Sequence, residues 1–429
     1  MRRFQLQFVA APREPRRHSG RRVRQRTESV KILITSIVDL KRVTRNRIHV
    51  FADYLSRKHD VTVLCLNAWW LDKGEAGTHS DWPCGDPSFR EMFARTRILY
   101  LGERRIPPVL QEFTCLRTLD SLLRTVQYAS FDVHVNYSSL VAGYFVARKV
   151  RDRGIPTVFD VADDLPRRLG RSPQVPRFLR PPARLVADFM FDANVGLASE
   201  VTFVTEALKD AYHAHDGKGQ VIPNGANPGI VASQRTHLLR RDLGIDDGFV
   251  VGFAGVLLPR VDLDTMFVAV KRASRKAGDV RMLVVGGGPG LREARQLAER
   301  HGISDRVVFT GLVPSGRVEE YISCMDACLI PIEDSADCQH ALPLKLLEYM
   351  ACEKPVISSR LAGVIETAGD RVLYASDSEE LEDRILQLYH DRAFGNGLGL
   401  QGRSFVEQNY TWPMICARFE DVLTAVRHE

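Results

Sequence analysis

The sequence lacks several features that would assign it to a class at once. No apolar run approaches the ~20 residues that cross a bilayer. The eight cysteines include no C-x-x-C pair, which favours reduced cytosolic thiols over a disulfide framework, and Cys324 and Cys328 are expected to be small buried hydrophobes. Walker A, H-E-x-x-H and G-x-S-x-G motifs are missing as well. A soluble globular protein with none of these signature sites is expected.

The body of the chain also lacks net charge. Residues 1–30 hold nine arginines and two glutamates, a net charge of +7, so the remainder of the +6 chain sums to −1. A neutral body disfavours nucleic acid as a partner. Residues 1–29 show no hydrophobic periodicity and are predicted to be disordered. A transit peptide, a membrane tether and a misassigned start codon all explain this arginine-rich leader.

What is present is a regular alternation of strands and helices over 429 residues, enough for two domains. Strand 30–38, the helical repeat from Ile48 to Leu55 and strand 61–66 form a βαβ unit, which predicts a parallel sheet covered by helices. Further strands are expected at 97–101, 133–137, 157–161 and 201–205.

Turn formers at 221–229 mark the domain boundary. A second series of strands follows at 250–253, 281–285, 307–310, 327–331, 356–358 and 372–374, with a last helix at 412–426. The prediction is therefore an α/β protein of two facing, doubly wound, Rossmann-like domains, 30–225 and 226–405, with a terminal segment 406–429. The cleft between the domains is the expected site.

Two insertions interrupt the first series. The segment from Trp69 to Arg95 is rich in Gly, Pro, Asp and Trp and is interpreted as a loop. The segment Leu165–Leu185 holds six arginines, five prolines and no acid, interleaved with large apolar residues. Adsorption to anionic lipid and a plain solvated loop explain it equally well.

The glycine-rich run 286–290 follows a strand and opens a helix, so it raises an NAD-dependent oxidoreductase as an alternative. The third glycine of G-x-G-x-x-G would fall at Leu291, however. Thr310 and Gly311 stand where a ribose-binding acid would end the next strand. The dinucleotide interpretation is therefore the lesser hypothesis.

The helix 343–351 carries a more specific signal. Pro343 is predicted at its first position, and the free amides of Leu344 and Lys345 would lie at the positive end of the helix dipole. Lys345 and Glu348 share a face, so the cation could hold a diphosphate while the carboxylate accepts hydrogen bonds from a ribose. A surface ion pair on an ordinary amphipathic helix explains the same two residues.

The second half resembles the family 4 glycosyltransferases in five motifs that occur in order: Gly252–Gly255, Val284–Pro289, Arg306–Pro314, Pro343–Ala351 and Lys354–Ile357. The resemblance is good from about Pro223 to Val372 and looser before it. It implies a GT-B fold in which the C-terminal domain binds a nucleotide-sugar donor and the last helix crosses back to the N-terminal, acceptor-binding domain. It also implies a retaining reaction without a catalytic metal or separate cofactor.

The family's donor-binding residues can be carried over to matching positions of this sequence. The resemblance then implies that Glu348 binds the ribose and that the backbone of Val313 pairs with the base. It also implies that Leu344 and Lys345 cradle the diphosphate. Gly287 belongs to the glycine-rich motif of the donor site. The chain departs from the family at His340, where a glutamate usually contacts the donor sugar, and at Val256 and Val261, where an Arg and a Lys usually flank the diphosphate. We expect Arg260 and Lys345 to substitute for these cations.

On the acceptor side, Asp163 and Asp164 follow a strand at the cleft edge and are candidates for orienting or deprotonating an acceptor hydroxyl; turn capping explains them equally well. His340, in the place of the glutamate that contacts the donor sugar, is the third catalytic candidate. Arg45, Arg47 and His49 are candidates for an acceptor phosphate or solvated helix residues. The expected donor is a UDP- or GDP-sugar and the acceptor a glycan or lipid-linked intermediate, handled in the cytoplasm or at the inner membrane face. A binding protein without turnover and a GT-B epimerase are further alternatives.

Overall fold

The computed structural model describes residues 29–68, 86–101, 106, 108–171, 175–212, 219–227 and 234–428. The expectation for the arginine-rich leader therefore lies almost entirely outside the described residues. None of the helices in the described ranges combines the length and the apolar character that crossing a membrane requires.

The first domain contains a seven-stranded parallel sheet in the order β3-β2-β1-β4-β5-β6-β7. Its strands are β1 Lys31–Ser36, β2 Asp60–Cys65, β3 Arg97–Tyr100, β4 Val133–Tyr137, β5 Thr157–Val161, β6 Glu200–Phe203 and β7 Gln220–Val221. Its helices are α1 Arg47–Leu55, α2 Arg90–Arg95, α3 Pro108–Thr114, α4 Leu116–Thr125, α5 Val141–Arg151, α6 Leu165–Leu169, α7 Arg180–Leu197 and α8 Glu206–Ala211. Strands β4 and β5 are buried on both faces, as expected when helices cover both sides of a parallel sheet.

The second domain contains a six-stranded parallel sheet in the order β10-β9-β8-β11-β12-β13. Its strands are β8 Phe249–Ala254, β9 Val280–Val285, β10 Val307–Gly311, β11 Ala327–Ile330, β12 Val356–Ser358 and β13 Leu373–Tyr374. Its helices are α9 Gln234–Asp242, α10 Leu263–Ala277, α11 Leu291–His301, α12 Val318–Ser323, α13 Leu344–Ala351, α14 Ala362–Ala368, α15 Ser378–His390 and α16 Arg392–Asn409. The strand order reverses beside β1 and beside β8, so both domains are doubly wound, as predicted.

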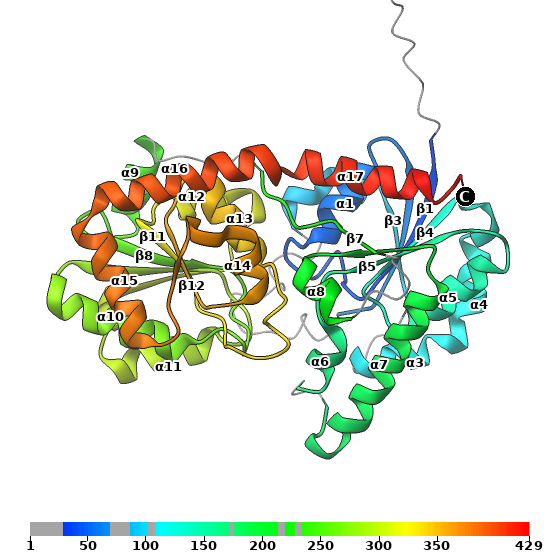
Figure 1. The fold of residues 1–429 in the computed structure, drawn as a ribbon, viewed down its shortest axis with the longest axis horizontal. Helices are drawn as coiled ribbons and strands as arrows, with labels where there is room; N and C mark the ends of the chain where they lie inside the picture. The colour runs from blue at the N-terminus through cyan, green and yellow to red at the C-terminus, as the bar shows by residue number, and fades with distance from the viewer. Residues whose placement is uncertain are drawn as a thin grey trace, which may run out of the picture.

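The chain crosses between the domains twice, and the two crossings lie side by side. In the first, the amide of Ala226 donates to the carbonyl of Tyr410 (2.8 Å). In the second, Trp412 donates back to Ala226 (3.0 Å). The last helix, α17 Trp412–Ala425, then runs onto the first domain beside α1, where the Phe419 and Phe51 rings stack with centroids 4.3 Å apart (Figure 1). The predicted return of the last helix is confirmed.

Three expectations about local structure need correction. Pro343 is the N-cap of α13, so the helix begins one residue later than predicted. The loop expected to end at Arg95 includes α2 as well as residues 69–85, which lie outside the described residues. The segment Leu165–Leu185 contains α6, a 3-10 turn (η5, Arg177–Leu179) and the start of α7, so it is not a plain loop.

Helix α16 was missed because its sequence contains four glycines, which disfavour a helix interior. Tertiary packing overrides that propensity. A Cβ on Gly399 would lie 2.3 Å from the carbonyl oxygen of Glu353, and one on Gly402 would lie 3.2 Å from Met350. These glycines let α16 approach α13 and the turn after it, and this packing holds α13 in place.

Two glycines of α16 therefore give opposite predictions. Gly399→Ala forces a methyl group against backbone and should destabilise the protein by about 1–3 kcal/mol. Gly397→Ala is the matched control, because no atom of the described residues lies within 4 Å of the place that its methyl group would take; it should stabilise the helix by up to ~1 kcal/mol. Urea denaturation of both variants measures the difference, and equal effects would contradict the close packing of α16.

Candidate functional site

The predicted donor helix α13 starts at the carboxyl edge of the second sheet and is anchored there by Tyr349. The buried Tyr349 hydroxyl accepts from the amide of Ala254 (2.7 Å) and lies 3.2 Å from the Ala254 carbonyl, at the end of the central strand β8. Within the described chain no side chain caps the helix start. The first amides of α13 are thus presented beside the end of β8, a geometry that suits an anion.

Lys345 places its side-chain amine at the start of this helix, in surroundings that disfavour the charged form. Its ammonium lies 3.8 Å from the centroid of the Phe253 ring. Burial, followed by the nearby charge of Arg260, lowers the pKa of Lys345 to about 7, while Glu348 acts in the opposite direction. The two cations predicted to replace the family's Arg and Lys are therefore close enough to repel each other, which is the arrangement that an anionic ligand stabilises.

The glycines around Lys345 are required by close approach. Gly255, at φ +148°, follows β8, and a Cβ on it would lie 2.9 Å from the Lys345 ammonium. A Cβ on Gly286 would meet the carbonyl of Gly255 at 2.1 Å. Gly287, predicted to bind the donor, is buried, and its carbonyl accepts from the amide of Leu257 (2.8 Å). The glycine-rich run thus packs two loops together at the rim of the site.

Glu348 faces the other domain. Its carboxylate lies 3.8 Å from the Arg45 guanidinium, which follows β1 of the first sheet. Glu319 of α12 is near both groups: burial raises its pKa, Arg45 lowers it and Glu348 raises it. The predicted ribose-binding carboxylate and a candidate acceptor-side arginine are therefore brought together across the boundary between the domains.

The predicted base-binding residue Val313 lies beside another contact between the domains. The amide of Ser315 donates to the buried Asp86 carboxylate (3.2 Å), and the Ser315 hydroxyl also bonds Asp86. The amide of Gly316 donates to the Ser88 hydroxyl (2.8 Å). The first domain thus supports the loop that carries Val313.

Two of the three predicted catalytic residues, Asp164 and His340, meet where the two domains contact each other, a boundary called the seam below. Arg167 donates from Nη1 to His340 Nδ1 (3.1 Å), which lies 3.3 Å from Asp164 Oδ2. Nδ1 of His340 thus lies between a guanidinium, which only donates, and a carboxylate, which only accepts. Asp164 is buried, caps α6 through the amide of Arg167 and also bonds the hydroxyl of Tyr212. Its carboxylate is fully engaged in holding the seam.

Asp163 is not part of that network. Its side chain is exposed and pairs with Arg168 (3.0 Å). The expectation that Arg47 and His49 meet an acceptor phosphate is wrong, and so is the alternative that they are solvated, because both are buried. Arg47 forms a bidentate pair with Asp160 (3.0 Å for both bonds) and donates to the carbonyl of Pro223 (2.7 Å).

His49 closes the start of its own helix instead of binding a ligand. Its Nδ1 accepts from the amide of Asn46 (3.2 Å), and its Nε2 lies 2.8 Å from the carbonyl of Leu40. Burial lowers its pKa to about 4. Sequence reasoning also missed Phe253, Tyr349 and Tyr212, for which no local pattern exists, since each acts on a residue distant in sequence.

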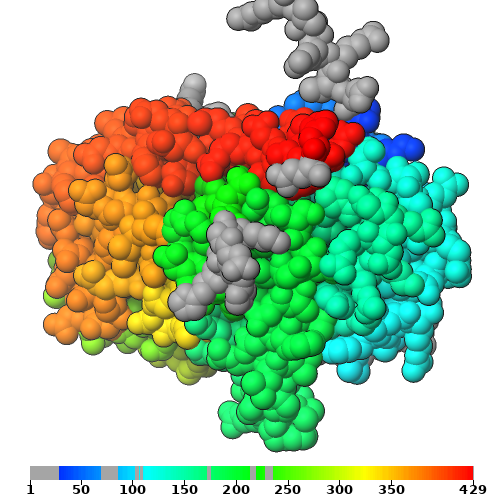
Figure 2. Space-filling view, turned by 45° about the vertical axis from the view of Figure 1, so that its right-hand side comes forward, coloured from blue at the N-terminus to red at the C-terminus, as the bar shows by residue number. Residues whose placement is uncertain are grey.

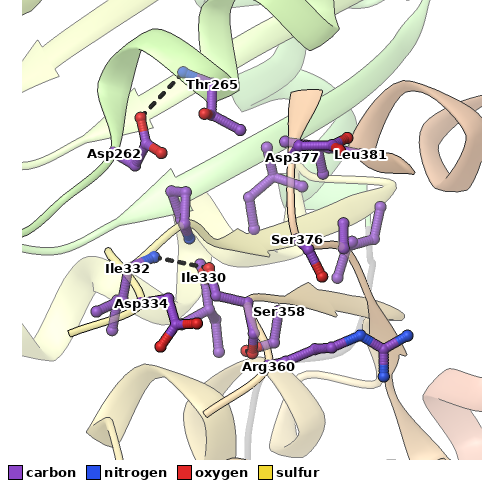
Figure 3. Close-up of a pocket in the computed structure, with 15 residues that line it drawn as sticks. Asp262, Thr265, Ile330, Ile332, Asp334, Ser358, Arg360, Ser376, Asp377 and Leu381 are labelled. Atoms are coloured by element: carbon purple, nitrogen blue, oxygen red, sulfur yellow. Dashed lines mark hydrogen bonds between the residues drawn. The ribbon is translucent and has the colours of Figure 1, made fainter. Parts of the chain in front are cut away.

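A small pocket lies at the same sheet edge but beside different elements (Figure 3). It is lined by the ends of β11, β12 and β13 and by the starts of α10 and α15, including Asp262, Ser358 and Asp377. Its cavity volume of about 80 Å³ is far below the roughly 300–1,000 Å³ of a typical ligand site. Its lining includes neither Lys345 nor Glu348, so it is not the candidate donor site.

Two family models match the chain, one in each domain. Residues 45–225 match the glycosyl transferase 4-like domain, and residues 248–391 match the model described as glycosyl transferases group 1. The GDP-mannose-dependent alpha-(1-6)-phosphatidylinositol monomannoside mannosyltransferase of Mycolicibacterium smegmatis is 27% identical over 242 residues, 54% of this chain and 63% of that protein. This chain therefore covers less than two thirds of that relative.

Solved structures agree on the fold over most of the chain. Sucrose-phosphate synthase from Thermosynechococcus elongatus superposes with a TM-score of 0.71 at 17% identity, covering 92% of this chain and 98% of that one. HepE from Anabaena, solved with UDP and glucose, gives a TM-score of 0.69 at 17% identity, covering 92% and 99%. Together, the matches in both domains and the GT-B architecture show that the chain belongs to the family 4-like, group 1 glycosyltransferases.

Proposed function

We propose that this protein transfers a sugar from a nucleoside-diphosphate sugar to a glycan or lipid-linked acceptor. The observation that carries the proposal is the Lys345 ammonium, held 3.8 Å from the centroid of the Phe253 ring at the start of α13, where no side chain of the described residues caps the first amides. An anion bound there would offset the like charges of Lys345 and Arg260 and accept hydrogen bonds from free amides at once. A donor diphosphate supplies that anion.

The domain arrangement supports a donor that bridges the cleft. Glu348 would accept hydrogen bonds from the ribose hydroxyls, and the backbone of Val313 would pair with the base. Arg45 lies 3.8 Å from Glu348 and would add a third cation from the first domain. We propose that these cations stabilise the departing diphosphate as charge develops on it, so that no catalytic metal is needed. Retention of the anomeric configuration follows from the family resemblance alone.

On the acceptor side, we propose that His340 contacts the transferred sugar in place of the family's acid. Both contacts of the ring with Asp164 and Arg167 are made at Nδ1, so Nε2 is the ring nitrogen available to a sugar hydroxyl. Asp164 and Arg167 hold the ring and are positioning residues. Asp163, which is exposed beside the seam, is the carboxylate available to an acceptor hydroxyl.

The donor and the place of action are part of the same proposal. A relative of this chain is named as GDP-mannose-dependent and HepE was solved with UDP, so UDP- and GDP-sugars are the donors to test first. We propose that the enzyme acts in the cytoplasm, peripherally at the inner membrane face, where an anionic surface would present a lipid-linked acceptor.

A thermal-shift panel of UDP-, GDP-, ADP- and dTDP-sugars tests the donor assignment. A ligand at about 100 times its dissociation constant adds ~2.7 kcal/mol to the stability of the folded state. For a chain of this size, we expect one nucleotide class to raise Tm by several degrees. No shift with any nucleotide sugar, together with a shift by NADH, would transfer the assignment to the oxidoreductase alternative.

Measuring the Kd of the same nucleotide sugar in variants of the protein tests where it binds. Lys345→Met and Glu348→Gln should each raise the nucleotide Kd at least about tenfold, because each removes a charged partner. Lys345→Met should leave the free protein at least as stable as the wild type, since it removes a desolvated charge. The exposed Glu299→Gln and the α10 variant Lys271→Met are controls. Unchanged affinity in both site variants would remove the donor assignment.

His340→Ala separates transfer from binding. We expect nucleotide affinity to stay within about twofold of the wild type, because His340 does not hold the diphosphate, while donor turnover falls by about a hundredfold. Turnover is measured as nucleoside diphosphate released in the presence of a membrane-lipid extract. The exposed His237→Ala is the control. Wild-type turnover in His340→Ala would show that His340 only joins the two domains and takes no part in transfer.

A protein that binds nucleotide sugar without turnover is the second candidate function, favoured by a histidine where the family has an acid. It predicts a thermal shift in the panel but no nucleoside diphosphate release in the wild type.

A further inference from the structure

The turn η5 and the first half of α7 lie on a projection from the first domain (Figures 1 and 2). Large apolar side chains are exposed on it. Phe178 is 79% exposed, Leu185 70% and Phe189 71%. Leu179 and Val186 are exposed beside them. This group of five residues is called the apolar tip below. Single exposed apolar residues are ordinary, but five on one projection indicate an interaction surface.

The apolar tip is not the packing face of α7. Ala187, Phe191 and Val195 point inward and belong to a buried cluster that continues into the second domain. Leu185 and Phe189 lie four residues apart and so share a face on the opposite side of the helix. Helix α7 is therefore apolar on two sides, and only one side is covered within the described chain.

The arginines of the basic segment fall into two groups. Three are tied to acids near the seam: Arg167 to Asp164, Arg168 to Asp163, and Arg171 to Glu333 and Asp337 of the second domain. The other three lie among the residues of the apolar tip: Arg177, Arg180, which donates to the carbonyl of Val175 (3.1 Å), and Arg184, which pairs with Asp188 of the same helix (3.5 Å). The predicted lipid surface is therefore shorter than Leu165–Leu185 at its start and extends to Phe189 at its end.

We propose that the apolar tip and its three arginines dock on an anionic lipid bilayer. Phenylalanine and leucine side chains insert at the boundary between headgroups and acyl chains, while guanidinium groups bind lipid phosphate. Charge favours this occupant over a second copy of the chain. A two-fold self-contact would place arginines of one copy against those of the other, and Asp188 of the same helix is already paired with Arg184 (3.5 Å).

The docking surface is linked to the cleft by α6, which packs against α7 and whose Arg167 contacts His340. Contact with a bilayer would hold the edge of the cleft near the headgroups, where a lipid-linked acceptor could enter without leaving the membrane. This consequence rests on the proposed function. The binding itself does not, because it requires neither donor nor acceptor.

Co-sedimentation of the full-length protein with vesicles tests the proposal. Phosphatidylcholine vesicles are compared with vesicles that also contain phosphatidylglycerol. Phe178→Ser/Phe189→Ser should lower binding to the anionic vesicles at least about tenfold without changing any charge. Arg177→Gln and Arg184→Gln should each lower it about fivefold. Phe394→Ser on α16 and Arg275→Gln on α10 are matched controls that should bind like the wild type.

The arginine-rich leader carries a net charge of +7 and is the same in every variant, so only differences between variants count. Fluorescence of Phe189→Trp should be quenched further by brominated phosphatidylglycerol than that of Phe394→Trp. Wild-type binding by Phe178→Ser/Phe189→Ser would overturn the proposal. So would a concentration-dependent dimer in light scattering that this double variant abolishes. A positive thermal shift with nucleotide alongside either result would leave the donor site standing.

Discussion

The desolvation of one ammonium group is the constraint on which the rest of the site depends. Lys345 lies against the face of Phe253, beside another cation, at the start of a helix whose first amides have no side-chain cap within the described chain. Such a group costs free energy in the absence of a ligand. The fold maintains it because Tyr349 fixes α13 to the end of β8, and because the glycines of α16 let that helix pack closely over the turn after α13.

The two domains meet through polar contacts on both sides of this helix. Asp86 holds the loop after Val313 on one side, and the Asp164–Arg167–His340 network closes the other. The two crossings pair with each other at Ala226, and Arg47 ties the first crossing to β5 through Asp160. The proposed donor and acceptor sides are thus positioned by the same contacts between the domains, which explains why residues proposed for different roles touch one another.

The alternation of apolar runs was sufficient to predict both sheets, because strands buried on both faces leave a continuous apolar signature. It missed α16, in which Gly399 is explained by the nearby backbone of Glu353 and Gly402 by the nearby side chain of Met350. In the site, spacing along one helix indicated Lys345 and Glu348. It could not indicate that Arg45 faces Glu348, or that Arg47 and His49 are buried, because those outcomes depend on groups far away in the sequence.

Proton uptake on nucleotide binding tests the role of Lys345 most directly. At pH 8 a lysine whose pKa is about 7 is mostly neutral. A diphosphate beside it favours the charged form, so binding should take up close to one proton, about 0.9 per site. Calorimetric titration in buffers of different ionisation enthalpy measures this number. We expect uptake at pH 8, little at pH 6 and none in Lys345→Met. Binding without uptake at pH 8, or uptake that persists in Lys345→Met, would contradict the central role of this ammonium.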